Sequence, residues 1–325
     1  MLKYRILAAA FLVAAGALAA EESAATPSAA APFTVYGLKG PSGVGMVRMF
    51  EEPPTAEGVP VSLEALANVE LMIAKLVSGE AKVGILPPNI AAKLAAAGVP
   101  LQAAAVVNNG MLNLLSADPT IRSIADLRGK SVEVAGQGAT PDNVFRRILS
   151  ANGLSPGKDV KLGFSLAYPE IAQALIAGRV AVALLPEPFA TMALLGRPTL
   201  TQVCDVQAEW ARVGGSATYP MTLLVVDARF AASRPAAVRA VADAYRASLE
   251  WARAHPAEAG TLVEKHGLGV KAAVAAAAIP KSAYAFTSAA EARPAIEALL
   301  RVFLETSPAS IGGRLPPASF YLERY

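Results

Sequence analysis

The chain has 325 residues, of which 54% are hydrophobic and 17% charged, and its formal net charge is +3. This composition excludes a disordered chain, and it lacks the excess of Lys and Arg typical of nucleic-acid-binding proteins. A single cysteine, Cys204, leaves no disulfide framework, and we expect it to be a buried, unreactive thiol.

The N-terminal segment is typical of a signal peptide. Residues 1–5 carry two basic side chains, residues 6–18 form an apolar run, and an Ala-x-Ala cleavage site ends at Ala19. The run is too short to span a membrane, so we expect cleavage near Ala19 and export to the periplasm. A membrane anchor that stays attached is the alternative. Loss of the two basic residues leaves 27 basic and 26 acidic side chains, a net charge of +1.

Residues 20–32 contain only Ala, Ser, Thr, Pro and Glu, and predict a disordered linker. The remainder, from Phe33 onward, is long enough for two domains.

The first folded unit alternates strands with glycine loops and helices. Its predicted elements are a strand at 33–38, a glycine loop at 37–43 leading to a helix near Gly45, a strand at 59–63, a helix capped by Asn68, and a buried strand at 83–86 that stops at Pro87-Pro88.

A shift of 99 residues places a second unit on the first without a gap. Gly79 falls on Gly178, and Pro87 falls on Pro186. The same order of strands, helices, glycines and prolines occurs twice, which predicts an α/β fold of two similar lobes with mostly parallel sheets. The alternative is a chance likeness, because few other side chains are identical.

The second glycine loop carries the clearest binding signal. A strand at 131–135 leads into Gly136-Gln137-Gly138-Ala139-Thr140, and a helix begins at Pro141 with Thr140 as its predicted N-cap. Free N–H groups at such a helix start favour acceptors and anions. Because ligand sites in open parallel sheets lie beyond the carboxyl ends of the strands, we expect both glycine loops and both proline stops to converge on one cleft.

The chain is predicted to cross between the lobes twice. Strands at 101–107 and 111–116 precede a first crossing at Asp118-Pro119, and the strand at 222–227 makes the return. The first lobe would then comprise residues 33–117 and 222–325, and the second residues 118–221, joined by a hinge. After Ser233 the pattern is helical, with helices expected from Pro235 and after a capping box at Ser288.

The signal peptide, Gly40-Pro41-Ser42-Gly43, the loop from Gly136 to Pro141, and the segment ending Pro186-Glu187-Pro188-Phe189 together resemble one family. It is the nitrate/sulfonate/taurine and thiamine-pyrimidine type of ABC transporter substrate-binding protein. The resemblance extends from about Phe33 to the last helices. It implies the type II periplasmic binding fold, a small-molecule ligand and a permease partner in the inner membrane. Members of the family bind anions, aminopyrimidines and other small molecules.

The resemblance and the strand ends together give a set of candidate ligand-binding residues. The set is Gly40, Pro41, Ser42, Gly43, Pro88, Asn89, Asn108, Asn109, Gln137, Gly138, Ala139, Thr140, Tyr168, Glu187 and Tyr219. The resemblance implies that residues 40–43 form the first lobe's wall of the cleft and that residues 137–140 surround the ligand's acceptor atoms. It implies that Glu187 lies at the rear of the cleft. Leu38 and Pro41 make this first loop less polar than in nitrate and sulfonate binders, which favours an aromatic or partly apolar ligand.

Each of these polar candidates also has a structural interpretation. Glu187 either accepts from a ligand amine or fixes the end of its strand. Tyr168 either stacks on a ring or packs at a helix start. Asn108 and Asn109 either bind the ligand's donors and acceptors or form a turn, and Tyr219 lies either in a lid or in a plain loop.

Enzyme and metal signals are missing from the sequence. His255 and His266 lack acidic neighbours at zinc-ligand spacing, Pro141 breaks a dinucleotide fingerprint, and no P-loop or Gly-x-Ser-x-Gly motif occurs. We therefore predict a monomeric, non-catalytic solute receptor with no cofactor, no metal and no nucleic-acid partner. The alternatives are an exported ligand sensor, or an enzyme on the same fold acting on a small heterocycle or carboxylate.

Overall fold

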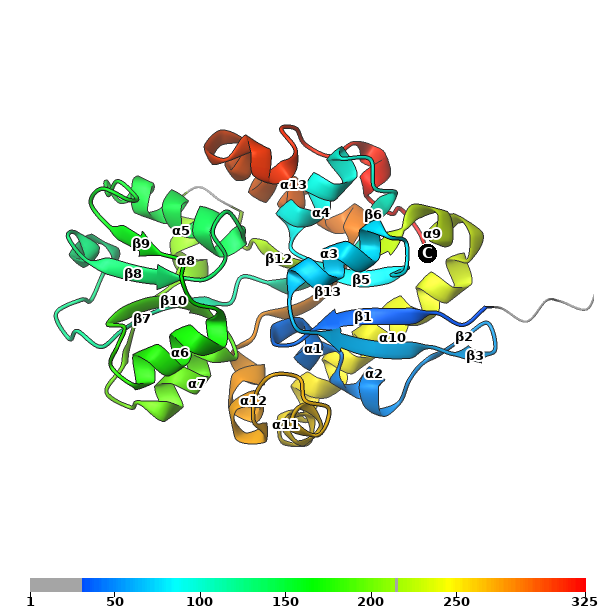
Figure 1. The fold of residues 1–325 in the computed structure, drawn as a ribbon, viewed down its shortest axis with the longest axis horizontal. Helices are drawn as coiled ribbons and strands as arrows, with labels where there is room; N and C mark the ends of the chain where they lie inside the picture. Colours follow the sequence, from blue (N-terminus) through cyan, green and yellow to red (C-terminus); the bar gives the residue numbers. More distant parts are fainter. Residues whose placement is uncertain (1–30, 214–215) are drawn as a thin grey trace, which may run out of the picture.

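The computed structural model describes residues 31–213 and 216–325, which form two α/β lobes (Figure 1). The predicted signal peptide and residues 20–30 of the predicted linker lie outside the described residues. Within the described chain, no helix combines the length and apolar character needed to cross a membrane.

The first lobe is built on a six-stranded sheet of order β13-β6-β12-β5-β1-β4. β1 pairs in parallel with β4 and β5, whereas β12 is antiparallel to β5 and β6, and β13 is antiparallel to β6. Its strands are β1 Thr34–Leu38, β4 Ser62–Leu66, β5 Val83–Leu86, β6 Leu101–Asn109, β12 Pro220–Asp227 and β13 Tyr284–Ser288, with a separate hairpin of β2 Thr55–Ala56 and β3 Val59–Pro60.

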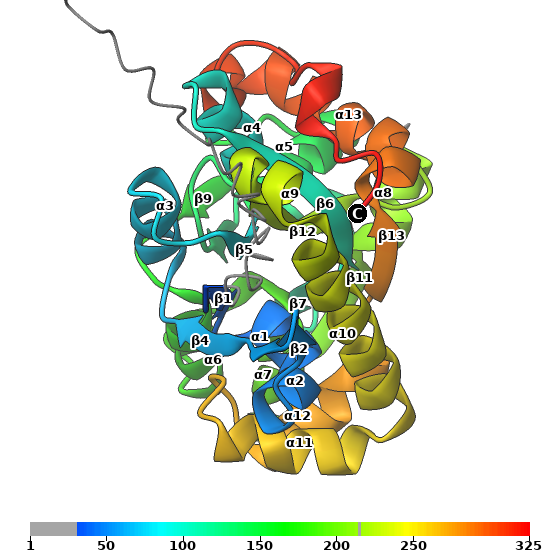
Figure 2. The ribbon, with the colours of Figure 1, turned by 90° about the vertical axis from the view of Figure 1, so that its right-hand side faces the viewer.

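Helices cover both faces of this sheet (Figure 1). On one face lie α3 Val69–Val77, α4 Pro88–Ala96 and α13 Ala289–Thr306; on the other lie α1 Pro41–Gly45, α2 Val47–Glu51, α10 Pro235–Ala254, α11 Pro256–Lys265 and α12 Ala272–Ala278. Figure 2 shows the long α10 beside α1 and α2, with α9 Ala228–Ser233 at its start. Short 3₁₀ helices occur at Ile279–Lys281, Pro308–Ile311 and Ala318–Phe320.

The second lobe has a five-stranded sheet of order β11-β7-β10-β8-β9. Its elements are β7 Leu112–Ser116, a 3₁₀ helix Ile124–Leu127, β8 Ser131–Val134, α5 Thr140–Ala151, β9 Lys161–Gly163, α6 Tyr168–Ile176, β10 Val182–Pro186, α7 Phe189–Gly196, β11 Thr201–Asp205 and α8 Val206–Arg212. Cys204 lies on β11 and is half-buried rather than fully buried as predicted; burial raises the pKa of its thiol to about 12, so the thiol is protonated at neutral pH.

The sheets confirm the prediction of two similar units. The order β9-β8-β10 in the second lobe repeats β4-β1-β5 in the first, with all four pairings parallel. Helices α3 and α6 are offset by the predicted 99 residues at both ends. Only these three strands in each lobe are parallel. The remaining strands pair antiparallel, so the sheets are mixed rather than mostly parallel.

The first crossing between the lobes lies earlier than predicted. β7, placed in the first lobe from the sequence, pairs with β10 and β11 and so belongs to the second sheet. The chain therefore changes lobe at Gly110-Met111, directly after β6, rather than at Asp118-Pro119. Strand patterns do not reveal which sheet a strand joins, because that depends on pairing between distant residues.

Two further boundaries differ from the prediction. The helix expected near Gly45 begins at Pro41, because proline is well suited to the first helical turn. The strand expected at 59–63 divides into β3 and β4. Two of the three predicted helix caps are confirmed: Asn68 Oδ1 accepts from Leu71 N at 3.0 Å, and Ser288 Oγ accepts from Glu291 N at 3.3 Å.

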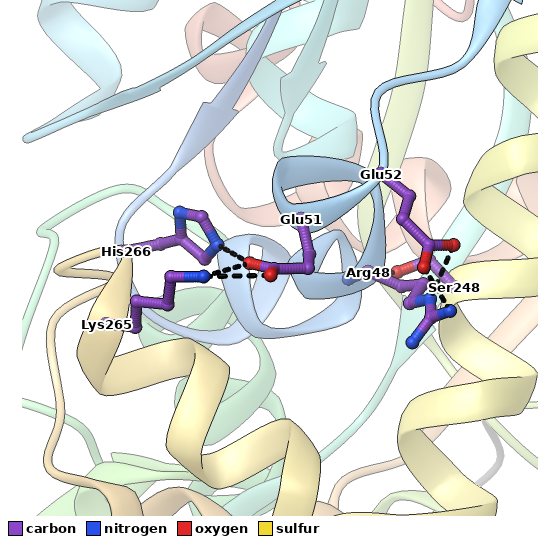
Figure 3. A network of polar contacts seen from close by, with 6 residues as sticks. All are labelled: Arg48, Glu51, Glu52, Ser248, Lys265 and His266. Atoms are coloured by element: carbon purple, nitrogen blue, oxygen red, sulfur yellow. Dashed lines mark hydrogen bonds and ion pairs between the residues drawn. The ribbon is translucent and has the colours of Figure 1, made fainter.

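A polar network joins α2 to α10 and α11 (Figure 3). Lys265 Nζ lies 2.7 Å from Glu51 Oε2, and His266 Nε2 lies 2.9 Å from the same oxygen. The hydrogen bonds from Lys265 and His266 hold the pKa of the Glu51 carboxyl below its usual value of 4.5. On the other side of α2, the Arg48 N–H donates to Ser248 Oγ on α10 at 3.1 Å.

We expect Glu51→Gln to destabilise the protein at neutral pH. The loss of stability should become smaller as the pH falls. A depressed folded-state pKa stabilises the fold above the unfolded-state value, and that stabilisation disappears as the pH falls through the folded-state pKa. Urea unfolding of wild type and variant between pH 3 and pH 7 measures this difference. Glu52→Gln, which removes only a pairing with Arg48 one turn away, is the control. A wild-type to variant difference that does not change with pH would contradict the assignment.

Candidate functional site

The two lobes meet at the carboxyl ends of their parallel strands. In the first lobe β1 and β5 end just before α1 and α4, and in the second β8 and β10 end just before α5 and α7. Asn89 Nδ2, after the first lobe's proline stop, donates to the Gly138 carbonyl oxygen of the second glycine loop at 3.3 Å. A Cβ built on Gly40 of the first glycine loop would lie 3.5 Å from the Phe189 ring. Each glycine loop therefore touches the proline stop of the opposite lobe.

Two backbone N–H groups of the second glycine loop already donate to acceptors within the protein. Gly136 and Gly138 have φ of 74° and 75°, which only glycine adopts readily. The Asp142 carboxylate accepts from Gly138 N at 2.9 Å, and Ala139 N donates to the Gly136 carbonyl at 3.0 Å. These two amides are therefore already paired.

The predicted N-cap of this helix is wrong. Ala139 occupies the N-cap position and Thr140 is the first helical residue. No side chain caps this terminus: the Asp142 carboxylate reaches back past the N-cap to the Gly138 N–H in the loop. The Thr140 hydroxyl is buried and has no hydrogen-bond partner.

The first glycine loop is fixed from within its own lobe. Gly40, with φ 99°, donates its N–H to the Leu268 carbonyl at 2.9 Å. The Tyr284 hydroxyl donates to the Pro41 carbonyl at 3.0 Å, and the Ser42 hydroxyl lies 3.4 Å from the Leu38 carbonyl. A Cβ on Gly43 would lie 2.6 Å from the same Leu38 oxygen, so the helix start packs directly on the end of β1.

Buried polar side chains without partners gather around the facing loops. Asn108 is 0% exposed and neither amide atom has a partner, while Asn89 Oδ1 and Thr191 Oγ1 are also buried and unpaired. Asn108 lies opposite Tyr284 in the β6–β13 ladder, so both side chains project from the sheet face covered by α1. A buried polar group left unpaired costs about 1–3 kcal/mol, so such a group calls for a ligand or a bound water.

A carboxyl group and two aromatic rings lie on the second lobe's side. Glu187 is 3% exposed, and its Oε2 accepts from Thr191 N at 3.0 Å. Burial raises the pKa of this carboxyl, an effect that hydrogen bonds from Thr191 and the charge of Lys281 oppose. Tyr168 stacks on Phe189 with ring centroids 5.8 Å apart and an interplanar angle of 16°. Burial raises the pKa of the Tyr168 phenol, so its hydroxyl stays protonated.

The remaining candidate residues differ in burial and in distance from the facing loops. Tyr219 is completely buried at the hinge, where its ring meets Trp210 at 5.3 Å, so it is no surface lid. Asn109 donates its backbone N–H to the Ala283 carbonyl at 2.9 Å, which fixes the end of β6. Pro88 is buried at the start of α4, and Gln137 is exposed at the tip of its loop.

The lobes also contact each other away from the glycine loops. The Thr306 hydroxyl at the end of α13 donates to Asn143 Oδ1 on α5 at 3.1 Å. Arg147 and Glu305 form an ion pair of 3.7 Å between the same helices. These contacts hold α5, and therefore the second glycine loop, against the first lobe.

Sequence reasoning missed three residues at this interface: Phe189, Tyr284 and Thr191. Phe189 belonged to the motif that indicated the family, but no role was given to it. Tyr284 went unassigned because β13 was not predicted. The alternation of Tyr284, Phe286 and Ser288 between Pro280 and the capping box was a usable strand signal.

Comparisons with known proteins agree with this architecture. A family model described as NMT1/THI5 like matches residues 55–259. A solved structure described as an ABC transporter from Parabacteroides distasonis is 28% identical, with a TM-score of 0.77, and the match covers 90% of this chain and 99% of that chain. No curated protein sequence gives a significant match.

Two more distant structures show the fold alone. The periplasmic aliphatic sulphonate binding protein SsuA from Escherichia coli is 17% identical over 90% of this chain and 92% of that chain, with a TM-score of 0.72. The periplasmic nitrate-binding protein NrtA from Synechocystis PCC 6803 is 13% identical over 86% and 84%, with a TM-score of 0.64. Together these likenesses confirm the predicted two-lobed α/β fold.

Proposed function

The chain belongs to the NMT1/THI5-like family, and on this premise we propose that it is the solute-binding component of an ABC importer. It would capture a small molecule between its lobes and deliver it to a permease in the inner membrane. The family match confirms the resemblance inferred from the sequence, and the Parabacteroides distasonis structure, described as an ABC transporter, supports the transport role.

One structural observation carries this proposal. Buried polar groups with no protein partner, above all both amide atoms of Asn108, collect where the glycine loops and proline stops of opposite lobes touch. A ligand enclosed there would satisfy these groups and would be held by both lobes at once. Because ligand contacts with both lobes form only when the lobes are together, the ligand would stabilise the closed arrangement.

The same proposal covers the protein's cellular location, its oligomeric state and the functions that we do not expect it to have. We take the protein to be exported, with cleavage near Ala19, because residues 1–19 have the pattern of a signal peptide. We take it to be monomeric, non-catalytic and without a nucleic-acid partner. The near-neutral charge supports the last point, and the half-buried thiol of Cys204 is protonated at neutral pH and so is a weak nucleophile.

We expect at least one small metabolite to raise the melting temperature of the purified protein. A ligand that binds only the folded state stabilises it by about 2.7 kcal/mol at 100 times its Kd, which a dye-monitored melt detects readily. Asn108→Leu keeps the side-chain volume but removes the amide, and should reduce the shift for the same metabolite. A full panel of small solutes with no shift at millimolar concentration would refute the receptor role.

A further inference from the structure

The two glycine loops are held in different ways. In the described chain, each hydrogen bond to residues 40–43 comes from the first lobe, where the Leu268 carbonyl accepts at the start of the loop and the Tyr284 hydroxyl donates to it. The second loop instead bonds to the opposite lobe, because Asn89 Nδ2 donates to the Gly138 carbonyl at 3.3 Å. The position of the second loop therefore depends on contact between the lobes.

Asn143 makes a second connection, from the next carbonyl of the same loop. Its Nδ2 donates to the Ala139 carbonyl at 3.1 Å, and its Oδ1 accepts from the Thr306 hydroxyl at 3.1 Å. Asn143 lies on α5 in the second lobe, and Thr306 is the last residue of α13 in the first (Figure 1). Asn143 is 2% exposed. A backbone carbonyl of the glycine loop is therefore connected to the first lobe through one buried amide.

The bonding of Asn143 gives it a structural role rather than contact with a ligand. Protein groups engage both ends of its amide, whereas both amide atoms of Asn108 lack a partner. The bond to the Ala139 carbonyl also fixes which end of the amide faces Thr306, because only the nitrogen can donate. The group facing Thr306 is therefore an acceptor, which a hydroxyl satisfies and a methyl group does not.

The Thr306 hydroxyl has an acceptor on each lobe. It lies 2.8 Å from the Val302 carbonyl of its own helix and 3.1 Å from Asn143 Oδ1, and it carries a single hydrogen. When the lobes separate, this hydrogen can stay with Val302 while water reaches Asn143. Without the hydroxyl, Asn143 Oδ1 would be buried and unpaired in the closed protein only. Removal of the hydroxyl therefore raises the free energy of the closed arrangement above that of the open one.

The neighbouring polar contacts do not replace this connection. The ion pair between Arg147 and Glu305 is 3.7 Å long, and its side chains are 42% and 64% exposed, so it contributes little to closure. In the 99-residue repeat, Asn143 falls on Val44 of the first lobe, whose side chain has no hydrogen-bonding group. The connection through Asn143 thus belongs to one lobe only.

We propose that Thr306 and Asn143 form a latch between the lobes, which sets the fraction of closed protein without touching a ligand. Both are positioning residues, because they act on a bound solute only by holding the second glycine loop across the cleft. The latch rests on the proposed function for its effect on affinity, since affinity for the closed form falls in proportion to the fraction of protein that is closed. The equilibrium between the lobes itself requires no solute.

The distance between two spin labels measures this equilibrium in extensively dialysed, solute-free protein. The labels are attached at Lys93→Cys on α4 and Ser150→Cys on α5, which are exposed and lie on opposite lobes, and Cys204→Ser removes the native thiol. Pulsed electron resonance then gives the closed and open populations. We expect Thr306→Val to lower the closed-to-open ratio at least about fivefold, because a buried acceptor is left unpaired in the closed form.

Three further variants separate the latch from a general effect on the helix. Thr306→Ser keeps the hydroxyl and should restore the wild-type ratio. Thr261→Val on α11 is the matched control: Thr261 is also exposed, and its hydroxyl also bonds to the carbonyl four residues earlier, Ala257, at 3.2 Å within the first lobe. It should leave the ratio unchanged. Asn143→Ala removes the acceptor, so Thr306→Val should have no further effect in that background.

The outcomes are decided without a ligand. A ratio that Thr306→Val leaves unchanged overturns the latch, as does a solute-free wild type with no closed population. An equal loss in Thr261→Val also overturns it, because a bond within one helix would then account for the change. The metabolite melts test the receptor role separately: a panel without a hit refutes that role and leaves the measured lobe equilibrium as it stands.

Discussion

Gly110→Ala is expected to destabilise the protein by about 2–3 kcal/mol, the upper part of the usual range for overpacking a filled core. Gly110 makes the first crossing between the lobes and is buried. A Cβ built there would lie 2.4 Å from Tyr219 Cζ and 1.9 Å from Gln207 Oε1. The measurement is urea unfolding of wild type and variant at neutral pH.

The Tyr219 ring rather than Gln207 should set this cost. The Gln207 amide is the far end of a flexible side chain and can move at the loss of its 2.8 Å hydrogen bond to the Ala217 carbonyl. The Tyr219 ring is fully buried and packed on Trp210, so it has no free direction in which to move. A displaced Tyr219 also shifts the start of β12, which is the return crossing.

A double-mutant cycle identifies the contact responsible. Tyr219→Leu frees the space that the new methyl group needs, so Gly110→Ala should cost less in that background, with a coupling of about 1 kcal/mol or more. Gln207→Ala should give a much smaller coupling. Additive effects of Gly110→Ala and Tyr219→Leu would show that the crossing tolerates a side chain and that the close packing at Gly110 has no energetic consequence.

Local sequence signals were sufficient to predict the elements that depend only on residues close together in the sequence. The helices α3 and α6 follow from apolar spacing, and Asn68 caps α3 as its type and position predict. The 99-residue repeat appeared because glycines with positive φ, such as Gly79 and Gly178, must recur wherever the same helix end recurs. These features depend on neighbours within a few residues, so the sequence contains them directly.

The errors arose where partners distant in sequence decide the outcome. Whether β7 joins the first or the second sheet depends on β10 and β11, about seventy residues or more away, which no local pattern encodes. Thr140 has the right type for an N-cap, but the helix begins one residue earlier than its pattern indicates and Ala139 takes the N-cap position. The sequence could name Asn108 as a candidate, yet only the packed structure shows that its amide lacks a partner.

Phe145→Ala is expected to cost about 3–5 kcal/mol, the largest effect we predict for a single substitution, because it empties a large site in the second lobe's core. Phe145 is 0% exposed on α5, within the core formed by the sheet and its helices. Urea unfolding measures the loss. Because α5 carries Asp142 and follows directly on the second glycine loop, the variant should also show a smaller ligand-induced rise in melting temperature.

Phe164→Ala is the matched control for this second effect. Phe164 lies in the same lobe but is only partly buried, with the Arg146 guanidinium 5.8 Å from its ring, so its removal should cost about 1 kcal/mol. If Phe145→Ala lost stability but kept the full ligand-induced shift, the glycine loop would be held by its own turns and by Asn89. If both substitutions reduced the shift equally, α5 would have no special part in positioning that loop. Only a ligand-induced shift that is reduced in Phe145→Ala and kept in Phe164→Ala supports the view that core packing behind α5 sets the geometry of the cleft.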